Sequence, residues 1–249
     1  MVVEDYELNV SLQEYFYFQE CPQKFRIHRI LNPIPFKTNF ESSVYSIDHY
    51  RLQGYSSTFL DGIELHEFFK NFHELYYQSI VEEMMPENFK KDNPRGIFWL
   101  KQREKFHQLQ NKNLWFPFKT EFKIMTEKQR GIIDCIEFCM DGESLRLIDY
   151  KPKPHVNDME SILFYCNLLY EYQLTNDLDI PEIKEAGCYY YRLGEYQLIK
   201  LTNKQYQQIS EKISNVLEEI RNVNLTFNKS NCYNCQYPDV CKIEQLRRK

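Results

Sequence analysis

Two aspartates stand at matching distances from a predicted turn. Asp141-Gly142 separates two segments in which apolar and polar residues alternate, and this dipeptide is typical of a two-residue hairpin turn. Asp134 lies seven positions before Asp141 and Asp149 lies seven positions after Gly142, so we expect them to face each other across the hairpin. Carboxylates this close repel each other, and a divalent cation between them reverses the effect. The spacing therefore predicts a metal site, provided that no bulge or longer turn breaks the register.

Lys151 lies two residues after Asp149, so the pleat of a strand directs both side chains to the same face. Two acids and one ammonium group at one end of a sheet fit metal-dependent hydrolysis of phosphodiester bonds. In this interpretation the acids bind Mg²⁺ or Mn²⁺, and the lysine orients the attacking water or offsets charge on the phosphate. The triplet alone carries no weight, because Glu121 and Glu182 begin the same acid-x-Lys pattern. A solvated strand end is the alternative for Asp149 and Lys151.

The elements that position these residues follow from the hydrophobic period. Ser11 and Glu14 have capping-box spacing, and Pro22 is placed to open a second short helix. Residues 32–57 are typical of a long loop. Helical periods then cover 58–85, 96–111, 158–173 and 203–222, and strand-like alternation covers 116–126, 131–138, 144–151, 187–191 and 196–201. This order predicts an α/β (α+β) sandwich.

Three of the eight cysteines form a C-x2-C-x5-C pattern in the C-terminal tail: Cys232, Cys235 and Cys241. Three thiolates need a fourth ligand to complete either a tetrahedral zinc site or a cubane iron–sulfur cluster. Cys21, before Pro22 at a helix start, is the natural candidate and would attach the tail to the N-terminal helices. The remaining four lie in apolar patterns and are expected in the core: Cys135, Cys139, Cys166 and Cys188.

Composition excludes several classes of protein. The 249 residues carry 31 basic and 36 acidic side chains, for a net charge of −5, which argues against a positively charged coat but not against a local basic groove. No apolar run approaches the length of a membrane-spanning helix, and the first residues lack the pattern of a signal peptide. We therefore expect a cytoplasmic protein, in which cysteines bind metal or pack in the core before they form disulfides.

Five short motifs in order resemble a known family. They are Cys-Pro-x-Lys-Phe at 21–25, Gly-x-x-x-His at 62–66, Gly-x-x-Asp at 131–134, Asp-x-Lys at 149–151 and the terminal C-x2-C-x5-C. The series resembles the RecB-type branch of the PD-(D/E)XK nucleases that carries an iron–sulfur cluster. Within that branch it is most similar to the small single-domain CRISPR-associated exonucleases that act in spacer acquisition.

The resemblance implies a fold and a domain plan. The fold would be a restriction-endonuclease-like core sheet flanked by helices, with the N-terminal helices and the C-terminal tail joined by the cluster. Residues 1–249 would form one nuclease domain. Within it, 21–57 and 223–249 would form the cluster region, 58–112 a helical insertion and 113–222 the nuclease core.

The resemblance also implies roles for individual residues. His66 would bind metal from its helix, with Gly62 allowing close approach, although His66 alone is typical of a helix surface. Four groups would complete the catalytic centre: the carboxylates of Asp134 and Asp149, the backbone carbonyl of Tyr150, and Lys151 as the catalytic lysine. Four thiolates would bind a chiefly structural [4Fe–4S] cluster: Cys21, Cys232, Cys235 and Cys241. Glu121 stands where relatives often have an acid, but we do not assign it as a ligand.

The implied activity is a metal-dependent DNA exonuclease that prefers single strands or ends, with CRISPR integration proteins as partners. Basic side chains would contact phosphate, or form a solvated face: Lys119, Lys123, Lys128, Arg130, Lys151 and Lys153. One position departs from the family, because Ser161 occupies the place of a glutamine four residues before Tyr165. The alternative function is therefore a non-catalytic module that binds DNA ends or an integrase.

Overall fold

The computed structural model describes residues 9–31, 57–178, 180–221, 232, 235–238 and 241. The chain divides into two compact units. The first comprises Met1–Val44, Met125–Gly131 and Gln207–Lys249, and the second comprises Tyr45–Ile124 and Ile132–Tyr206. The acids predicted to bind metal belong to the second unit, and the cysteines predicted to bind a cluster belong to the first. The predicted loop at 32–57 lies outside the described residues except for its last position, which begins a helix.

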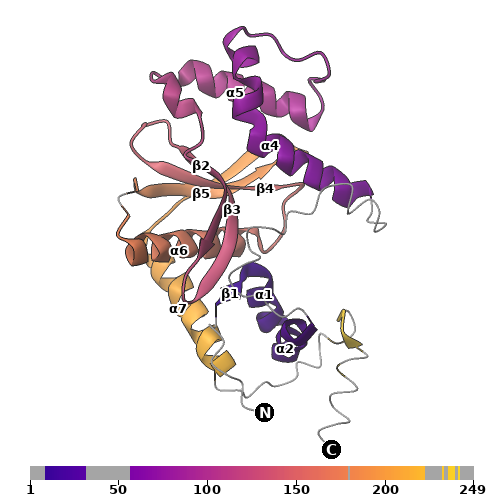
Figure 1. Ribbon diagram of the computed structural model, residues 1–249, viewed down its shortest axis with the longest axis vertical. Helices are drawn as coiled ribbons and strands as arrows, with labels where there is room; N and C mark the ends of the chain where they lie inside the picture. Colours follow the sequence, from indigo (N-terminus) through magenta and orange to yellow (C-terminus); the bar gives the residue numbers. More distant parts are fainter. Residues whose placement is uncertain are drawn as a thin grey trace, which may run out of the picture. The chain divides into compact units, whose positions relative to one another are not determined.

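The second unit is built on a mixed sheet in which β3, β4, β5 and β6 lie side by side in this order and β2 also pairs with β3 (Figure 1). The strands are β2 (Lys119–Met125), β3 (Gln129–Phe138), β4 (Leu145–Lys151), β5 (Ile183–Tyr190) and β6 (Glu195–Lys200). β3 and β4 are antiparallel, as are β5 and β6, whereas β4 and β5 run parallel. A parallel pair needs a crossover connection, which α6 (Asp158–Asn176) supplies.

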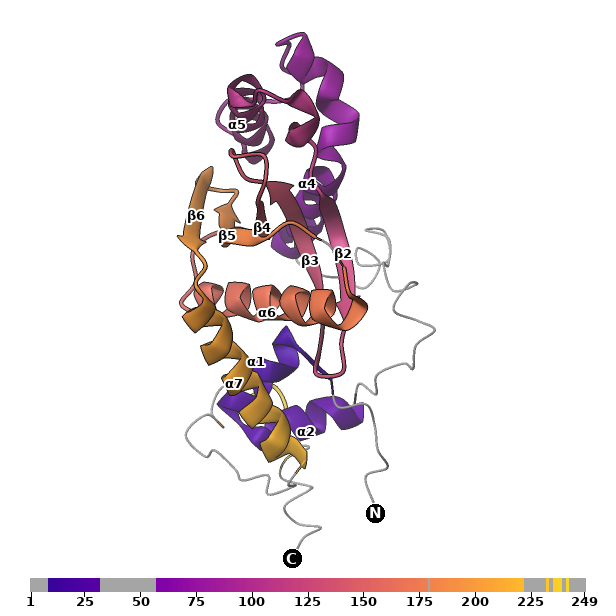
Figure 2. The same cartoon turned by 90° about the vertical axis from the view of Figure 1, so that its left-hand side faces the viewer.

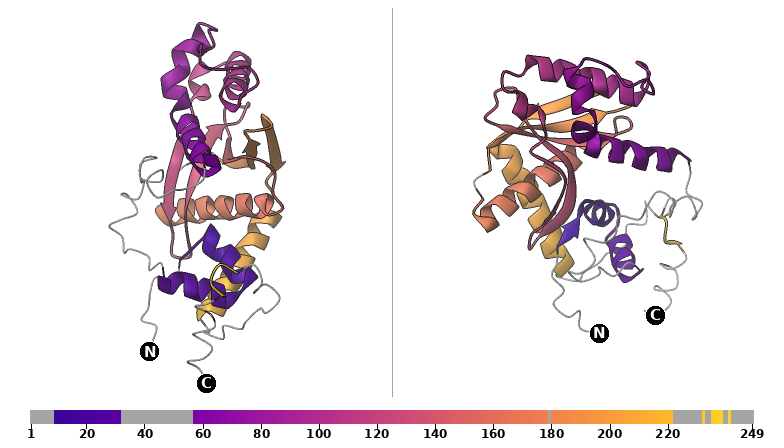
Figure 3. Two further views of the ribbon diagram at one scale, coloured as in Figure 1. Left: turned by 90° about the vertical axis from the view of Figure 1, so that its right-hand side faces the viewer. Right: turned by 45° about the horizontal axis from the view of Figure 1, so that its top comes forward.

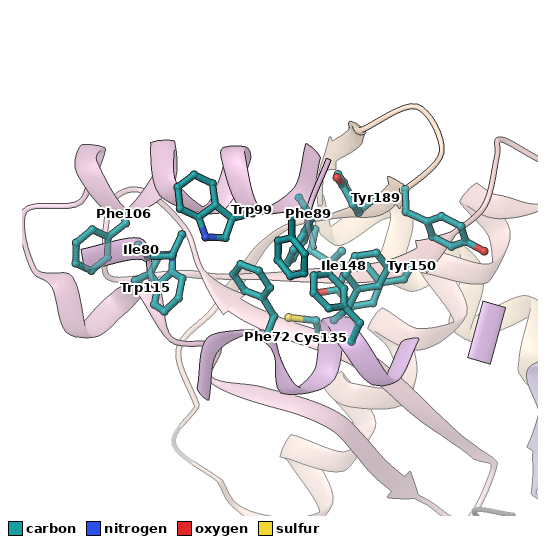
Figure 4. Packing of buried hydrophobic residues seen from close by; sticks show 14 of the residues in the cluster. Phe72, Ile80, Phe89, Trp99, Phe106, Trp115, Cys135, Ile148, Tyr150 and Tyr189 are labelled. Carbon is teal, nitrogen blue, oxygen red and sulfur yellow. The ribbon is translucent and has the colours of Figure 1, made fainter. Parts of the chain in front are cut away.

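Helices cover both faces of this sheet. α4 (Ser57–Val81) and α5 (Pro94–Gln108), followed by the 3-10 helix η1 (Lys112–Trp115), lie on one face, and α6 runs along the other (Figures 2 and 3). The face under α4 and α5 is rich in aromatic rings, including Phe72, Trp99 and Trp115 (Figure 4). The face under α6 is mainly aliphatic. The predicted α/β architecture is confirmed, and burial on both faces explains why β4 is apolar along most of its length.

Most element boundaries fall within a few residues of their predicted positions, and the differences have local causes. α4 ends at Val81, before the predicted Met85, because Glu83 adopts a left-handed backbone conformation with φ of 56°. α5 begins at Pro94 because the side chain of Asn93 accepts a hydrogen bond from the Gly96 amide at 2.8 Å. β5 begins at Ile183, four residues before the predicted strand, since its first residues pair with β4.

The first unit contains β1 (Val10–Ser11), α1 (Leu12–Glu20), α2 (Pro22–Leu31) and most of α7 (Asn203–Arg221). The predicted capping box is present, because the Ser11 hydroxyl accepts from the Glu14 amide and the Glu14 carboxylate accepts from the Ser11 amide at 2.8 Å. The same carboxylate pairs with Arg29 at 2.6 Å and with Arg130 at 2.7 Å. In the part of the chain that the structure describes, no helix has both the length and the apolar character needed to cross a bilayer.

Candidate metal centre

The β3–β4 hairpin has the predicted register. Cys135 pairs with Ile148, and continuing the ladder by one residue places Asp134 opposite Asp149. The connection is longer than the predicted two-residue turn, however. The Cys139 amide donates to the Ser144 carbonyl at 2.8 Å, which leaves residues 140–143 as a four-residue loop. This loop is centred on the same point as the predicted turn, so the register is unchanged.

The carboxylate of Asp141 explains why the loop is wider. It accepts hydrogen bonds from the backbone amides of Glu143 at 3.0 Å and Ser144 at 2.9 Å, and from the Ser144 hydroxyl at 2.7 Å. An aspartate that caps amides two and three residues ahead stabilises a local turn of its own. Gly142 fits at its place because its φ is 73°, a conformation that favours glycine.

Asp149 is buried, and Asp134 is largely buried, with 13% of its side chain exposed. Burial, followed by the charge of Asp149, raises the pKa of Asp134 well above its usual range. The backbone amide of Tyr150 donates to Asp134 Oδ2 at 2.8 Å, which opposes this shift without cancelling it. A carboxylate that faces a second carboxylate is a position at which a cation would relieve repulsion.

Lys151 is held by one of these acids. Its Nζ lies 2.7 Å from Asp149 Oδ2, and about a third of its side chain is exposed. Burial disfavours the charge on Lys151, but Asp149 outweighs burial and raises the pKa of the ammonium group. Lys151 therefore remains a cation at neutral pH, which suits a role in offsetting phosphate charge or orienting water and not a role as a base.

His66 approaches the acids from α4. Its Nδ1 lies 3.8 Å from Asp134 Oδ2, and its ring meets the ring of Tyr150 edge-on, with centroids 6.1 Å apart. Burial lowers the pKa of His66, although the charge of Asp149 and a hydrogen bond to the Tyr150 backbone oppose the shift. The neutral imidazole that results is the form that binds metal.

Glu121 completes the group, and sequence reasoning did not assign it. Ligand atoms of His66, Glu121 and Asp134 all lie within 4.8 Å of one another. Glu121 has a φ of 47°, a left-handed conformation that costs a non-glycine residue about 1–3 kcal/mol and interrupts the alternation of β2. The available clues were an acid on the strand before Asp134 and its place where relatives of the resembled family often have an acid. Among the described residues this is the one such group of three or more potential ligands, and Asp149 stands beside it, paired with Lys151.

A family model decides how this geometry is interpreted. The model for the PD-(D/E)XK nuclease superfamily matches residues 9–242, nearly the whole chain. The chain belongs to the PD-(D/E)XK nuclease superfamily. Members of this superfamily hydrolyse phosphodiester bonds with Mg²⁺ or Mn²⁺, and oxygen and imidazole ligands like those of the His66 group suit these ions. A search of curated proteins found no match.

Two residues of α6 bear on the predicted site. Burial and then the charges of Asp149 and Asp134 raise the pKa of Tyr165. Ser161, at the position where the family usually has glutamine, donates its hydroxyl to the Asn157 carbonyl at 3.0 Å within its own helix. Its side chain is therefore satisfied without contacting Lys151. Gly62 is also not essential for space, because a Cβ there would meet only the Tyr191 hydroxyl at 3.9 Å.

The basic residues proposed to contact phosphate have different surroundings. Arg130 is committed to the first unit, where it pairs with Glu14 at 2.7 Å and donates to the Asn9 carbonyl at 2.8 Å. The charge of Lys123 lowers the pKa of Glu121. Lys70, which sequence reasoning missed, acts on Glu121 more strongly than Lys123 does. It lies one helical turn after His66, on the same side of α4.

The C-terminal tail lies against the N-terminal helices of the first unit. Gln236 donates to the Tyr17 hydroxyl at 3.0 Å, and the Tyr237 hydroxyl lies 3.0 Å from Nδ1 of His28. Cys21 stands between the two helices that carry these partners. The four proposed cluster thiols are not grouped within 4.8 Å in the described residues, so the iron–sulfur cluster stays a prediction. The other four cysteines are buried, as predicted.

Proposed function

We propose that this PD-(D/E)XK protein is a metal-dependent DNA exonuclease. The observation that carries the proposal is the convergence of His66, Glu121 and Asp134, whose ligand atoms lie within 4.8 Å of one another beside Lys151 and its partner Asp149. A bound Mg²⁺ or Mn²⁺ would lower the pKa of a water molecule and neutralise charge on the scissile phosphate. The other roles in the reaction, which are to orient the attacking water and to contact the phosphates, would be filled by side chains of the protein.

Each residue has a distinct role in the proposed reaction. His66, Glu121 and Asp134 would hold the ion, and the Asp149 carboxylate and the Tyr150 carbonyl would offer further oxygen ligands on the adjoining strand. Lys151 remains protonated, because the ion pair with Asp149 at 2.7 Å favours its charge. Its ammonium group is thus placed to donate to the attacking water or to a phosphate oxygen.

The proposed substrate is DNA, in single-stranded form or at ends. A single strand exposes phosphates that lysines can contact one at a time, and Lys70 and Lys123 both act electrostatically on Glu121. These two cations would bind the phosphates next to the one that is cut. Such an activity would serve in CRISPR adaptation, where integration proteins would be its partners, or in DNA repair.

A [4Fe–4S] cluster bound by Cys21, Cys232, Cys235 and Cys241 is the second part of the proposal. The contacts of Gln236 and Tyr237 with α1 and α2 support it, because they bring the tail to the helices that flank Cys21. The backbone amide of Tyr237 also lies 3.4 Å from Cys235 Sγ, a hydrogen bond that favours a thiolate. The cluster would fix the tail and take no part in cleavage.

The test is cleavage of labelled single- and double-stranded DNA with Mn²⁺ and with EDTA. We expect cleavage from ends with Mn²⁺ and none with EDTA. Lys151→Ala and Asp149→Ala should each lower the rate by about a hundred- to a thousandfold, as loss of a principal electrostatic group does. Lys91→Ala, which removes an exposed lysine from a loop, is the matched control and should retain the wild-type rate. Unchanged rates in the two site variants would refute the assignment.

A second function is favoured by one observation. The Ser161 hydroxyl is bonded to Asn157, so the position that usually carries a glutamine presents no side chain to Lys151. A non-catalytic module that binds DNA ends or an integrase would tolerate this change. Tight DNA binding by the wild-type protein without cleavage in Mn²⁺ would support this alternative over the exonuclease.

A further inference from the structure

Tyr150 contacts the proposed metal centre through both its backbone and its ring. It lies between Asp149 and Lys151, and its amide donates to Asp134 Oδ2 at 2.8 Å. Because side chains alternate along a strand, the Tyr150 ring points to the opposite face of the sheet from those of its two neighbours. There it is buried in the aromatic cluster under α4 and α5 (Figure 4).

The Tyr150 ring contacts the helix that carries His66. It stacks on Phe69, with centroids 4.6 Å apart and an interplanar angle of 28°. Phe69 lies three residues after His66, so the two side chains occupy neighbouring positions on α4. The ring also meets the His66 imidazole edge-on, at 6.1 Å and 84°. The Tyr150 ring of β4 therefore contacts both His66 and Phe69 of α4.

The proposed ligands come from three different elements. Asp134 belongs to β3 and is fixed by the hydrogen bond from the β4 backbone, and Glu121 belongs to the neighbouring strand β2. His66 alone comes from a helix, and backbone pairing does not fix the position of a helix on a sheet. Only side-chain packing can set how far His66 lies from Asp134.

We propose that Tyr150 is a positioning residue, whose ring locates α4 on β4 and so holds His66 at the distance from Asp134 that metal binding requires. This inference rests on the proposed metal site but adds a role for a side chain that is not itself a ligand. The ring, and not the hydroxyl, makes both aromatic contacts. Residues that orient metal ligands in this way typically change metal affinity by 10- to 100-fold.

The opposing explanation is that Tyr150 only fills the core. Tyr189 offers a matched control, because it is fully buried in the same cluster and its ring lies 6.0 Å from Phe69 and 6.3 Å from Tyr150. No ring contact between Tyr189 and His66 occurs among the described residues. Tyr150→Leu and Tyr189→Leu should therefore destabilise the fold similarly while differing in their effect on the metal site.

The experiment measures Mn²⁺ binding to the full-length protein by electron paramagnetic resonance of the free ion, without DNA. We expect Tyr150→Leu to weaken binding at least about tenfold, Tyr150→Phe to stay within about twofold of the wild type, and Tyr189→Leu to bind normally. If Tyr150→Leu does not fold, Phe69→Leu removes the same stack from the side of the helix and should weaken binding similarly.

Three other results overturn the inference. Normal Mn²⁺ affinity in the stack variants would leave Tyr150 as ordinary core, and equal losses in Tyr150→Leu and Tyr189→Leu would indicate a general packing effect. No Mn²⁺ binding by the wild type would overturn the inference together with the metal site. A wild type that binds Mn²⁺ but does not cut DNA would refute the proposed nuclease and leave the role of Tyr150 standing.

Discussion

Two acids on the same strand of the hairpin have opposite surroundings. Glu137 on β3 is paired in register with Arg146 on β4, and Lys105 of α5 adds a second cation at 2.5 Å from its carboxylate. Three residues earlier on β3, the same register places Asp134 opposite another acid, Asp149. Glu137 and Arg146 form a balanced pair of opposite charges, whereas Asp134 and Asp149 form an unbalanced pair of like charges, although the two pairs share strands and register.

The pKa values of the two acids move in opposite directions. Burial would raise the pKa of Glu137, but Lys105 and Arg146 outweigh burial and lower it to about 2. Burial and the charge of Asp149 raise the pKa of Asp134. Glu137 with its own cations contributes to the fold, whereas Asp134, which faces another acid, is a position at which a bound cation would relieve repulsion.

The largest expected effect is on the balanced pair. Glu137→Gln should lower the free energy of unfolding by about 3–5 kcal/mol, because it leaves Lys105 and Arg146 buried without their carboxylate. Urea denaturation in EDTA measures this change.

Asp134→Asn is the matched substitution on the other pair. Without divalent metal it should lower the free energy of unfolding little, because the amide relieves repulsion with Asp149. Equal losses in Glu137→Gln and Asp134→Asn would contradict the distinction between the two pairs.

Acid should destabilise the region around the balanced pair in two steps. Burial and the charge of Lys105 lower the pKa of His73 from 6.5 to about 4, so the unfolded chain takes up this proton at a higher pH than the folded chain. Stability therefore falls as the pH drops from 6.5 to 4, by about 3 kcal/mol. Glu137, with its pKa lowered from 4.5 to about 2, contributes stability above pH 4.5 that is lost as the pH falls toward 2.

Urea midpoints between pH 7 and pH 4 test the first step. His73→Leu should remove most of the wild-type decline in this interval, since leucine has no proton to gain. An identical decline in the variant and the wild type would show that other groups cause it.

A smaller effect is expected in the helix that brings His66 to the unbalanced pair. Gly62→Ala should raise the free energy of unfolding by up to about 1 kcal/mol, because glycine is unfavourable in a helix interior and the new methyl group has room. Thermal unfolding measures the gain. A loss of stability or of Mn²⁺ binding would show instead that the site needs glycine at this position.

The smallest effect is expected on α6. Ser161→Ala should change stability by no more than about 0.5 kcal/mol and should leave DNA cleavage within about twofold, since the Asn157 carbonyl keeps the Ser161 amide as a donor at 2.9 Å. A tenfold loss of cleavage would assign the Ser161 hydroxyl a role at the acids that its hydrogen bond does not suggest.

Sequence patterns predicted the parts of this molecule that depend on local period. The capping box at Ser11, the helix starting at Pro22 and the register that faces Asp134 with Asp149 are examples. The turn type was wrong because the Asp141 carboxylate caps amides ahead of it, which the Asp-Gly pair alone does not reveal. The register did not depend on the turn type, because Asp134 and Asp149 lie at equal distances from the centre of the loop.

Glu121 shows why the rest could not be predicted. Its left-handed φ of 47° breaks the alternation of β2, so counting residues along the strand cannot tell which way its carboxylate points. The cations Lys70 and Lys105 belong to helices whose positions on the sheet depend on aromatic packing across the whole cluster. Such contacts join residues far apart in the chain, and no local pattern encodes them.

The four-residue connection between β3 and β4 makes loop length a determinant of chemistry. Adding one amino acid there would slip the pairing by one step, and Asp134 would then face Ile148 in place of Asp149. Every group named in the proposed reaction would still be encoded, yet the second carboxylate would turn into the apolar interior. Homologues can therefore vary the composition of this loop more freely than its size.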